Sequence, residues 1–174
     1  MATAQKPDLS IEETLTRMVG EWQLPLLRTC CAVLGSEDLA KDAVQETFLK
    51  AYRGLPSFRG ECSEKTWLMR IAVNTCKDYR RTQWLRHRNQ TSPIDELPEA
   101  VLPTTSVSRE LFLTVMSLPD KYKQVVLLYH YQSMTMEEVA DALRVSRPAV
   151  SRRLKKAYEL LRAELEGGAE HELG

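Results

Sequence analysis

One stretch of the sequence, residues 88–108, interrupts an otherwise helical hydrophobic pattern. It reads RNQTSPIDELPEAVLPTTSVS and contains three prolines and the three acids Asp95, Glu96 and Glu99. Proline blocks helix interiors because it lacks a backbone N–H, and the many polar residues leave this stretch little to bury. The pattern predicts a flexible acidic linker. Since the chain has 174 residues, each flank can form only a small domain with a modest core.

The residues before the linker have a helical period. Apolar and small residues recur at i, i+1, i+4 and i+5 from Leu39 to Tyr52. Ser36 is expected to cap this helix, with acids in its first turn, and Gly54 and Pro56 to end it. No segment alternates as a strand does, so the predicted fold class is all-α, with two small helical domains.

An earlier helix starts near Leu15. Pro25 lies inside its pattern and is expected to kink it, or to restart it before Leu26, because proline cannot donate the helical hydrogen bond.

Several classes of function find little support in the composition. No apolar run approaches the roughly 18–20 residues that cross a bilayer, and the N-terminal MATAQKPDLS lacks the apolar core of a signal peptide. We therefore expect a cytoplasmic protein without membrane insertion. No nucleophile with a base and no phosphate-cradling glycine loop is found, so neither an enzyme nor a cofactor is expected.

The four cysteines form no CxxC pair and have no histidine at ligand spacing, which argues against zinc or a disulfide framework. Buried reduced thiols are the favoured interpretation, and no metal site is predicted. A thiol-based redox sensor is an alternative, which requires Cys30 or Cys31 to be exposed with a lowered pKa.

Charge is unevenly distributed although the formal net charge is zero. Residues 144–162 hold seven Lys/Arg against the single acid Glu159, and residues 164–174 hold four Glu and no Lys/Arg. A local basic field attracts polyanions even on a neutral protein. Nucleic acid is therefore the first partner to consider.

The stretch FRGECSEKTWLMRIAVNTCKDYRR, residues 58–81, combines a helix with cations and aromatic rings. Its period places Trp67, Ile71 and Thr75 on an apolar face and Arg70, Asn74 and Lys77 on a neighbouring one. Rings stack on unpaired bases, arginine neutralises phosphate, and an amide can recognise a base edge. A solvated charged surface is the alternative. For Trp67 alone, burial in the core and a role facing DNA are about equally open, because large aromatic side chains dominate cores in any case; support of this helix is the interpretation we favour.

After the linker, TMEEVADALRVSRPAVSRRLKKAYELLR, residues 135–162, has the pattern of a helix-turn-helix. Thr135 and Glu138 form a capping box for a helix to about Leu143, and Ser146 can cap the next helix after a three-residue turn. Arg144 stands where many such turns have glycine. A helical hairpin with a solvated basic face is the alternative.

Two helical modules of this kind resemble the extracytoplasmic-function sigma factors of bacterial RNA polymerase. DAVQETFLKAYRGLPSFRG and TWLMRIAVNTCKDYRR are similar to sigma domain two, and LPDKYKQVVLLYHYQSMTMEEVADALRVSRPAVSRRLKKAYELLR is similar to sigma domain four. The resemblance implies domain two over residues 10–88, a linker over 89–107 and domain four over 108–166. At Pro148, Ala149 and Val150 the chain departs from the family's usual Gly-Thr-Val.

The resemblance implies a subunit that enables RNA polymerase to recognise the −35 duplex and the −10 single strand. A stand-alone helix-turn-helix regulator of duplex DNA is the alternative function. The implied partners are promoter DNA, an anti-sigma factor and core RNA polymerase, through the largest-subunit coiled coil and the flap of the second-largest subunit. In the family the linker threads toward the active-site cleft.

The same resemblance suggests three sets of site residues. The −10 set, in a loop that receives an extruded base and on the nearby strand backbone, is Asn74, Thr75, Lys77, Arg80 and Arg81. The −35 set is Arg147, Ser151, Arg152, Lys155 and Lys156. The polymerase-binding set, which shares one helix face at i, i+3, i+4 and i+7, is Asp42, Gln45, Glu46 and Leu49. On the residues alone, a solvated face without function is the favoured interpretation of these last four, and it is the resemblance that reverses this preference.

Overall fold

The computed structural model describes residues 10–86, 102 and 106–171. The described part is helical and contains no strand, in agreement with the predicted all-α class. Asp95, Glu96 and Glu99, the acids of the predicted linker, lie outside the described residues. Among the residues that are described, no helix combines the length and the apolar character needed to cross a membrane.

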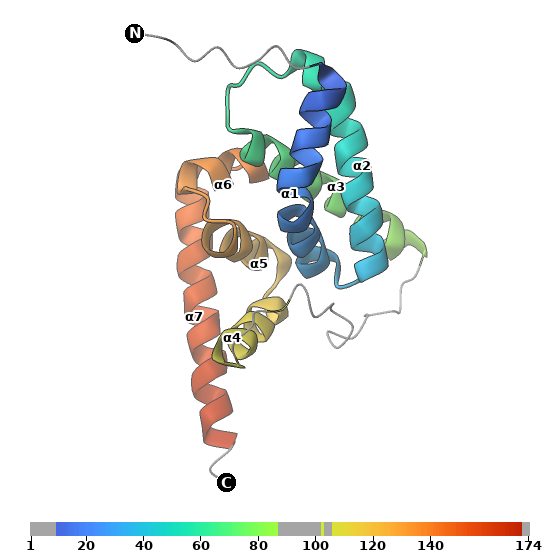
Figure 1. Cartoon of the computed structure of the whole chain (residues 1–174). Coiled ribbons are helices and arrows are strands. Elements are labelled where there is room, and N and C mark those ends of the chain that lie inside the picture. The colour runs from blue at the N-terminus through green and yellow to red at the C-terminus, as the bar shows by residue number, and fades with distance from the viewer. Residues whose placement is uncertain (1–9, 87–101, 103–105, 172–174) are drawn as a thin grey trace.

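The first region consists of three helices that pack on one another. They are α1 (Ile11–Leu34), α2 (Glu37–Gly54) and α3 (Glu64–Arg86), with the short 3₁₀ helix η1 (Leu55–Ser57) directly after α2. Figure 1 shows α1 and α2 side by side, with α3 crossing behind them. Met18, Leu26 and Leu68 are among its fully buried side chains.

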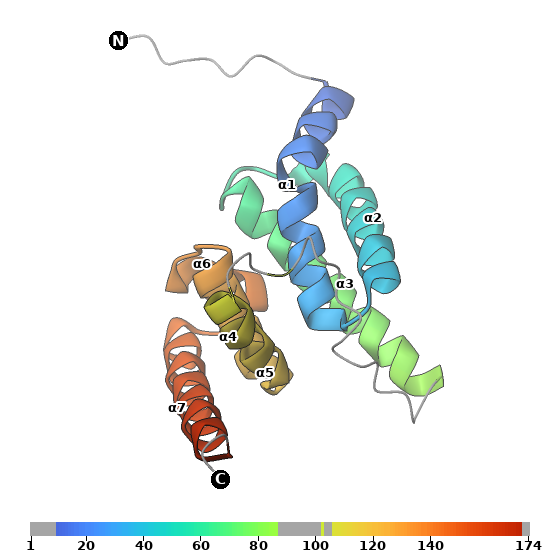
Figure 2. The same ribbon diagram turned by 60° about the horizontal axis from the view of Figure 1, so that its bottom comes forward.

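The second region contains the remaining helices. They are α4 (Ser106–Ser117), α5 (Asp120–Val126), the π-helical turn η3 (Leu127–Tyr131), α6 (Met136–Leu143) and α7 (Arg147–His171). Figure 2 shows α7 beside α5 and α6, with the C-terminus at its far end. α4 begins at Ser106 and α7 continues to His171, so this region exceeds the expected 108–166 at both ends.

The local start and stop signals in the sequence are confirmed. The Ser36 hydroxyl accepts a hydrogen bond from the Leu39 N–H at 3.4 Å, and α2 ends at Gly54. Thr135 and Glu138 exchange the two hydrogen bonds of a capping box, at 3.2 and 2.8 Å. These bonds satisfy N–H groups that have no partner inside the helix.

The expected restart at Pro25 is not observed, because α1 runs from Ile11 to Leu34 as one helix. Proline removes one backbone hydrogen bond, but the helix gains burial on both sides of it, at Met18 and Leu26. The Pro25 carbonyl accepts a hydrogen bond from the Thr29 hydroxyl at 3.0 Å. Tertiary packing therefore outweighs the local penalty here.

The two regions touch directly. α6 packs against α3, and α5 contacts α1. Figure 1 shows α6 lying between α3 and the upper end of α7. The first helix of the helix-turn-helix thus lies on the helix that carries the expected −10 residues.

Candidate nucleic-acid interface

All five expected −10 residues lie within α3, so the loop expected around Asn74, Thr75 and Lys77 is a helix. Directly before α3, the segment from Phe58 to Ser63, between η1 and α3, has no regular helix. It includes Gly60, whose φ of +71° falls in the left-handed region that favours glycine.

Thr75 does not face the solvent. Its side chain is fully buried, and its hydroxyl donates to the Ile71 carbonyl at 2.9 Å and accepts from Lys50 Nζ at 3.1 Å. The helical period had placed Thr75 on the apolar face, and the structure agrees with the period. The expectation that Thr75 contacts DNA is therefore corrected: this residue links α2 to α3.

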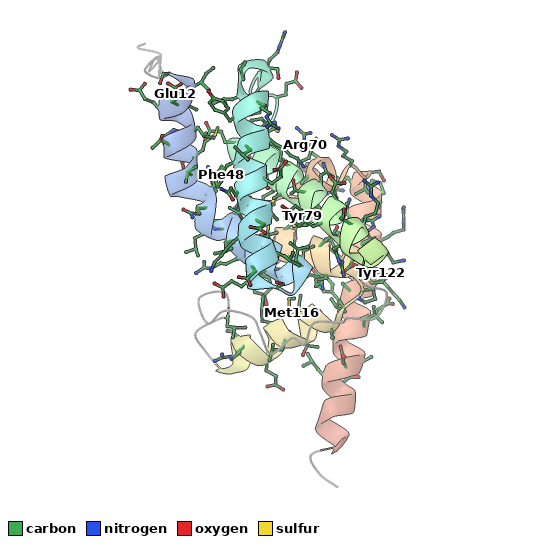
Figure 3. All side chains as sticks on the ribbon, turned by 90° about the vertical axis from the view of Figure 1, so that its right-hand side faces the viewer. Glu12, Phe48, Arg70, Tyr79, Met116 and Tyr122 are labelled. Atoms are coloured by element: carbon green, nitrogen blue, oxygen red, sulfur yellow. The ribbon has the colours of Figure 1, made fainter. Side chains whose placement is uncertain are left out.

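The other four expected −10 residues reach the surface of α3. Asn74 is half-buried and Lys77 is exposed, and both lie on the same side of the helix as Arg81, at i, i+3 and i+7. Arg81 lies 3.8 Å from Asp78 on its own helix. Arg80 forms an ion pair with Asp120 of α5. Figure 3 shows the course of α3 from Arg70 to Tyr79.

A pocket of about 430 Å³ opens at the N-terminal half of α3. Asn74 lines it, together with residues from α2, from η1 and the segment after it, and from α3. This volume falls within the range of roughly 300–1,000 Å³ that is typical of small-molecule sites. The lining residues besides Asn74 are Lys50, Gly54, Ser57, Phe58, Arg59, Glu61, Cys62, Trp67, Arg70 and Ile71.

Two stacked aromatic rings form part of the pocket wall. Phe58 and Trp67 have ring centroids 4.4 Å apart and an interplanar angle of 17°. Gly54 allows this arrangement, because a Cβ added there would lie only 3.2 Å from Trp67 Cζ2. Trp67 is largely buried, as expected for a supporting residue, whereas Phe58 is half-buried and more exposed to solvent.

The pocket brings in residues that the sequence did not assign to the −10 set. Lys50, Arg59 and Arg70 add positive charge around Asn74, and Phe58 adds a ring. Phe58 and Arg59 open the aromatic and basic stretch noted in the sequence, and Arg70 precedes Asn74 by four residues. The spacing of Arg70 from Asn74 on one helix face could have identified Arg70 as a pocket residue from the sequence. Lys50 could not have been identified in this way, because it reaches the pocket only through the packing of α2 on α3.

The expected polymerase-binding residues lie on α2. Asp42, Gln45 and Leu49 are exposed, and Leu49 retains 47% of its accessible surface, whereas Glu46 is half-buried. Burial raises the pKa of Tyr79 on α3, and the charges of Asp42 and Glu46 raise it further. These two acids therefore lie close enough to Tyr79 for their charges to affect the pKa of its hydroxyl.

The helix-turn-helix is present as predicted. Its turn passes through Arg144 in the left-handed conformation, φ 53° and ψ 47°, so arginine occupies the position where glycine is common. The Ser146 hydroxyl accepts from the Ala149 N–H at 3.3 Å. Val150 and Leu154 point into the core of the second region.

The expected −35 residues lie on the opposite side of α7. Ser151, Arg152, Lys155 and Lys156 are exposed. Lys156 pairs with Glu159 at 3.3 Å. Arg147 pairs with Glu137 of α6 at 2.5 Å. The pKa of Glu137 is lowered, first by a hydrogen bond from the backbone and then by Arg147.

Both regions match family models. Residues 18–86 match Sigma-70 region 2, and residues 115–163 match Sigma-70, region 4. The candidate −10 pocket and the polymerase-binding residues lie in the first match, and the helix-turn-helix lies in the second.

Curated relatives give the same result. The chain is 32% identical over 134 residues to the ECF RNA polymerase sigma-E factor of Haemophilus influenzae, an alignment that covers 69% of this chain and 71% of the relative. It is 34% identical over 142 residues to the RNA polymerase sigma factor YlaC of Bacillus subtilis, covering 78% and 82% of the two chains.

Solved structures share the fold. The sigma factor RpoE from Bartonella quintana, in complex with the anti-sigma factor NepR, gives a TM-score of 0.70 at 19% identity, over 87% of this chain and 98% of that one. CnrH, in complex with the cytosolic domain of CnrY, gives a TM-score of 0.67 at 23% identity, over 90% of this chain and 90% of that one. The sequence relatives, the two family models and this fold lead to one conclusion: the chain belongs to the ECF family of RNA polymerase sigma factors, the subunits that direct polymerase to promoters.

Proposed function

We propose that the pocket beside Asn74 captures a base from the separated −10 strand, while α7 binds the −35 duplex. The observation that carries this proposal is the position of the Asn74 amide in a pocket with an aromatic stack and several cations. An amide carries both a donor and an acceptor, as the pairing edge of a base does. A base must leave its stack to reach such a pocket, which requires melted DNA.

The surface of α3 next to the pocket supports a track for the strand backbone. Arg70, Asn74, Lys77 and Arg81 follow one another at helical spacing on one side of α3. At 1.5 Å per residue this row is about 16 Å long. Cations beside a partly exposed aromatic ring suit single-stranded DNA, because the cations can bind phosphates while the ring stacks on a base. Arg80, also in the proposed set, extends the positive charge toward the second region.

The −35 contacts are proposed for Arg147, Ser151, Arg152, Lys155 and Lys156. The early residues of a recognition helix meet base edges, and cations farther along it meet phosphates. The exposed positions on the N-terminal half of α7 have that order.

Polymerase binding is proposed for Asp42, Gln45, Glu46 and Leu49 on α2, with the coiled coil of the largest subunit as partner. An exposed leucine beside acids and an amide suits a protein surface better than a nucleic acid. The second region would meet the flap of the second-largest subunit.

A protein that masks these surfaces is proposed as a further partner. The structures of RpoE and CnrH, which share this fold, are complexes with another protein, NepR and the cytosolic domain of CnrY respectively. We place the chain's action in the cytoplasm, where polymerase and promoters are, and assign it binding rather than catalysis.

The experiment that tests this function is co-purification with core polymerase followed by run-off transcription. Core polymerase with the chain should initiate at defined start sites, whereas core polymerase alone should not. Specific binding of a promoter duplex without any polymerase association would instead support a stand-alone regulator.

A further inference from the structure

Arg147, one of the cations proposed to bind the −35 duplex, is paired with an acid of a different helix. Its Nε donates to Oε1 of Glu137 of α6 at 2.5 Å. Within the part of the chain that the structure describes, Arg152 and Lys155, two other cations of the proposed set, have no acid partner. The pair between Glu137 and Arg147 therefore needs an explanation of its own.

Stability of the fold explains this pair poorly. The side chains of Arg147 and Glu137 retain 59% and 65% of their accessible surface, and exposed ion pairs contribute little to folding because water and salt screen them. Glu137 has a local reason for its position, since the dipole of α6 favours an acid in the first turn. Arg147 has none, because it is the first residue of α7, where the helix dipole disfavours a cation.

The Glu137 carboxylate is held in place from the side of α6. The pKa of Glu137 is lowered first by a hydrogen bond from its own backbone N–H and then by the hydrogen bond from Arg147. α6 begins with a capping box, and in the turn toward α7 the Val145 N–H donates to the Ala140 carbonyl at 3.0 Å. Figure 2 shows α6 at the N-terminal end of α7. The carboxylate therefore fixes the Arg147 guanidinium relative to both helices.

The bond to Glu137 leaves the outer edge of the Arg147 guanidinium free. It uses Nε alone, and neither Nη1 nor Nη2 has an acceptor among the described residues. Two parallel N–H groups match O6 and N7 of guanine in the major groove, which is the commonest specific contact between a protein and a base. The first residues of a recognition helix are also the ones that meet base edges. Arg147 is therefore suited to recognise a guanine.

The acid beside Arg147 disfavours the other contact open to an arginine, the one with a phosphate. The negative charge of Glu137 offsets that of the guanidinium and repels a phosphate nearby. Arg152 and Lys155 keep their full charge, so they remain suited to the DNA backbone. The distribution of acids thus distinguishes a base-reading cation from phosphate-binding cations on one helix.

From these observations we infer that Glu137 is a positioning residue for −35 recognition, which holds Arg147 so that its guanidinium specifies a guanine at one position of the element. Arg147 supplies discrimination between sequences, whereas Arg152 and Lys155 supply affinity. Glu137 was not among the site residues expected from the sequence. This inference rests on the proposed docking of α7 on the −35 duplex.

The test uses holoenzyme assembled from core polymerase and the full chain. A promoter that this holoenzyme uses in run-off transcription is randomised across its −35 element, and the duplexes that bind are sequenced. Wild type should enrich guanine at one position by about ten- to a hundredfold over other bases, the scale of one bidentate base contact. Arg147→Ala should remove this preference. Arg147→Lys should remove most of it, because an ammonium keeps the charge but lacks the planar fork.

Glu137→Gln keeps the size of the side chain and removes its charge. The guanine preference should fall by about two- to fivefold, the scale of one exposed ion pair, with preferences at the other positions retained. Binding to a fragment with a scrambled −35 element should not weaken, because the change removes a charge that repels phosphates. Misfolding would weaken binding to every fragment. In an Arg147→Ala background, Glu137→Gln should have no further effect on base preference.

The matched control is Glu159→Gln. It makes the same chemical change at the acid that pairs with Lys156 at 3.3 Å farther along α7. Because that pair lies away from the first turn of the recognition helix, the guanine preference should equal that of wild type. Circular dichroism should show the same helix content for the wild-type chain and both glutamine variants.

The outcomes separate this inference from the docking of α7. A −35 preference that survives Arg147→Ala or Glu137→Gln, while Arg152→Ala/Lys155→Ala weakens binding, would overturn the role of the pair and leave the docking in place. Relaxed preference at every position in Glu137→Gln would also overturn it, since that result indicates a general displacement of α7. If Arg152→Ala/Lys155→Ala changes neither affinity nor its salt dependence, both the inference and the proposed −35 role of α7 fail.

Discussion

Phe58 stacks on Trp67 with their ring centroids 4.4 Å apart, which joins the segment after η1 to α3. This contact brings the start of the segment beside Asn74, which lies two turns farther along α3. The pocket therefore depends on a packing interaction between residues nine positions apart in the sequence.

Replacing Trp67 should damage both the fold and the pocket. Trp67→Ala removes a large, nearly buried side chain, and we expect a loss of about 3–5 kcal/mol in the free energy of unfolding. Trp67→Phe keeps a ring against Phe58 and should cost clearly less. Chemical denaturation followed by circular dichroism measures both. Equal stability of the Ala variant and the wild type would show that this stack does not support α3.

Asn74→Ala should affect only melted DNA. Losing one base-specific set of hydrogen bonds should cost about 1–3 kcal/mol, or roughly ten- to a hundredfold in open-complex stability. Permanganate reactivity of promoter thymines measures melting, and binding of a −35 duplex by the same holoenzyme is the control. An equal loss of both would indicate misfolding or a general DNA-binding role, and no loss of either would make Asn74 structural.

Leu49→Asp should weaken binding to core polymerase without unfolding the chain, because Leu49 is 47% exposed and packs on little of its own protein. Removing an apolar anchor and adding a charge should cost about 1–2 kcal/mol, or roughly five- to thirtyfold in affinity. Leu24→Asp is the matched control, since Leu24 is 45% exposed on α1. A pull-down with core polymerase that retains folded Leu49→Asp as well as the control would refute the α2 surface.

The cations of α7 should determine the salt dependence of −35 binding. In the triple variant Arg147→Ala/Arg152→Ala/Lys155→Ala, each phosphate that is no longer neutralised should reduce the slope of log affinity against log salt by about one unit. Replacing a residue that binds a base should instead relax discrimination between sequences. Lys41→Ala/Lys121→Ala removes exposed cations on other helices and serves as the control. Unchanged affinity and slope in the triple variant would mean that α7 does not dock as proposed.

The buried thiols should be unreactive in the folded chain. Burial, followed by the charge of Glu37, raises the pKa of Cys31 to about 11, and the pKa of Cys30 is raised well above its usual value beside Cys76. This is the opposite of the exposed, low-pKa cysteine that a redox sensor requires. Alkylation at neutral pH should modify half-buried Cys62 first and the others only as the chain unfolds. Mass spectrometry after alkylation of wild type and of the Cys62→Ser variant measures this. Rapid labelling of Cys30 or Cys31 in the native chain would instead support the alternative of a thiol-based redox sensor.

The raised pKa of Cys31 also predicts that the stability of the fold depends on pH. A thiol whose pKa is higher in the folded state than in the unfolded state favours folding below the unfolded value, near 9. As pH rises from about 9 to 11, the unfolded chain releases a proton that the folded chain retains, so stability should fall. Urea denaturation across this range should show a smaller fall for Cys31→Ala than for wild type.

The sequence by itself determined the features that depend on neighbours three or four residues away. The Ser36 cap, the capping box of Thr135 and Glu138, and the turn at Arg144 all follow from local hydrogen bonds and backbone preferences. The helical period likewise placed Thr75 on an apolar face, and the structure buries it. Family resemblance alone had assigned that residue to DNA.

The tertiary structure alone decided which distant groups meet. Thr75 is paired with Lys50, 25 positions away, and Arg70 with Asp141, 71 positions away. Pro25 stays within α1 because packing on both sides outweighs its missing hydrogen bond. Periodicity assigns a residue to a helix face but does not specify which other helix covers that face. That choice depends on how side chains from separate helices fill a shared core and satisfy one another's polar groups, and it is made only when the whole chain has folded.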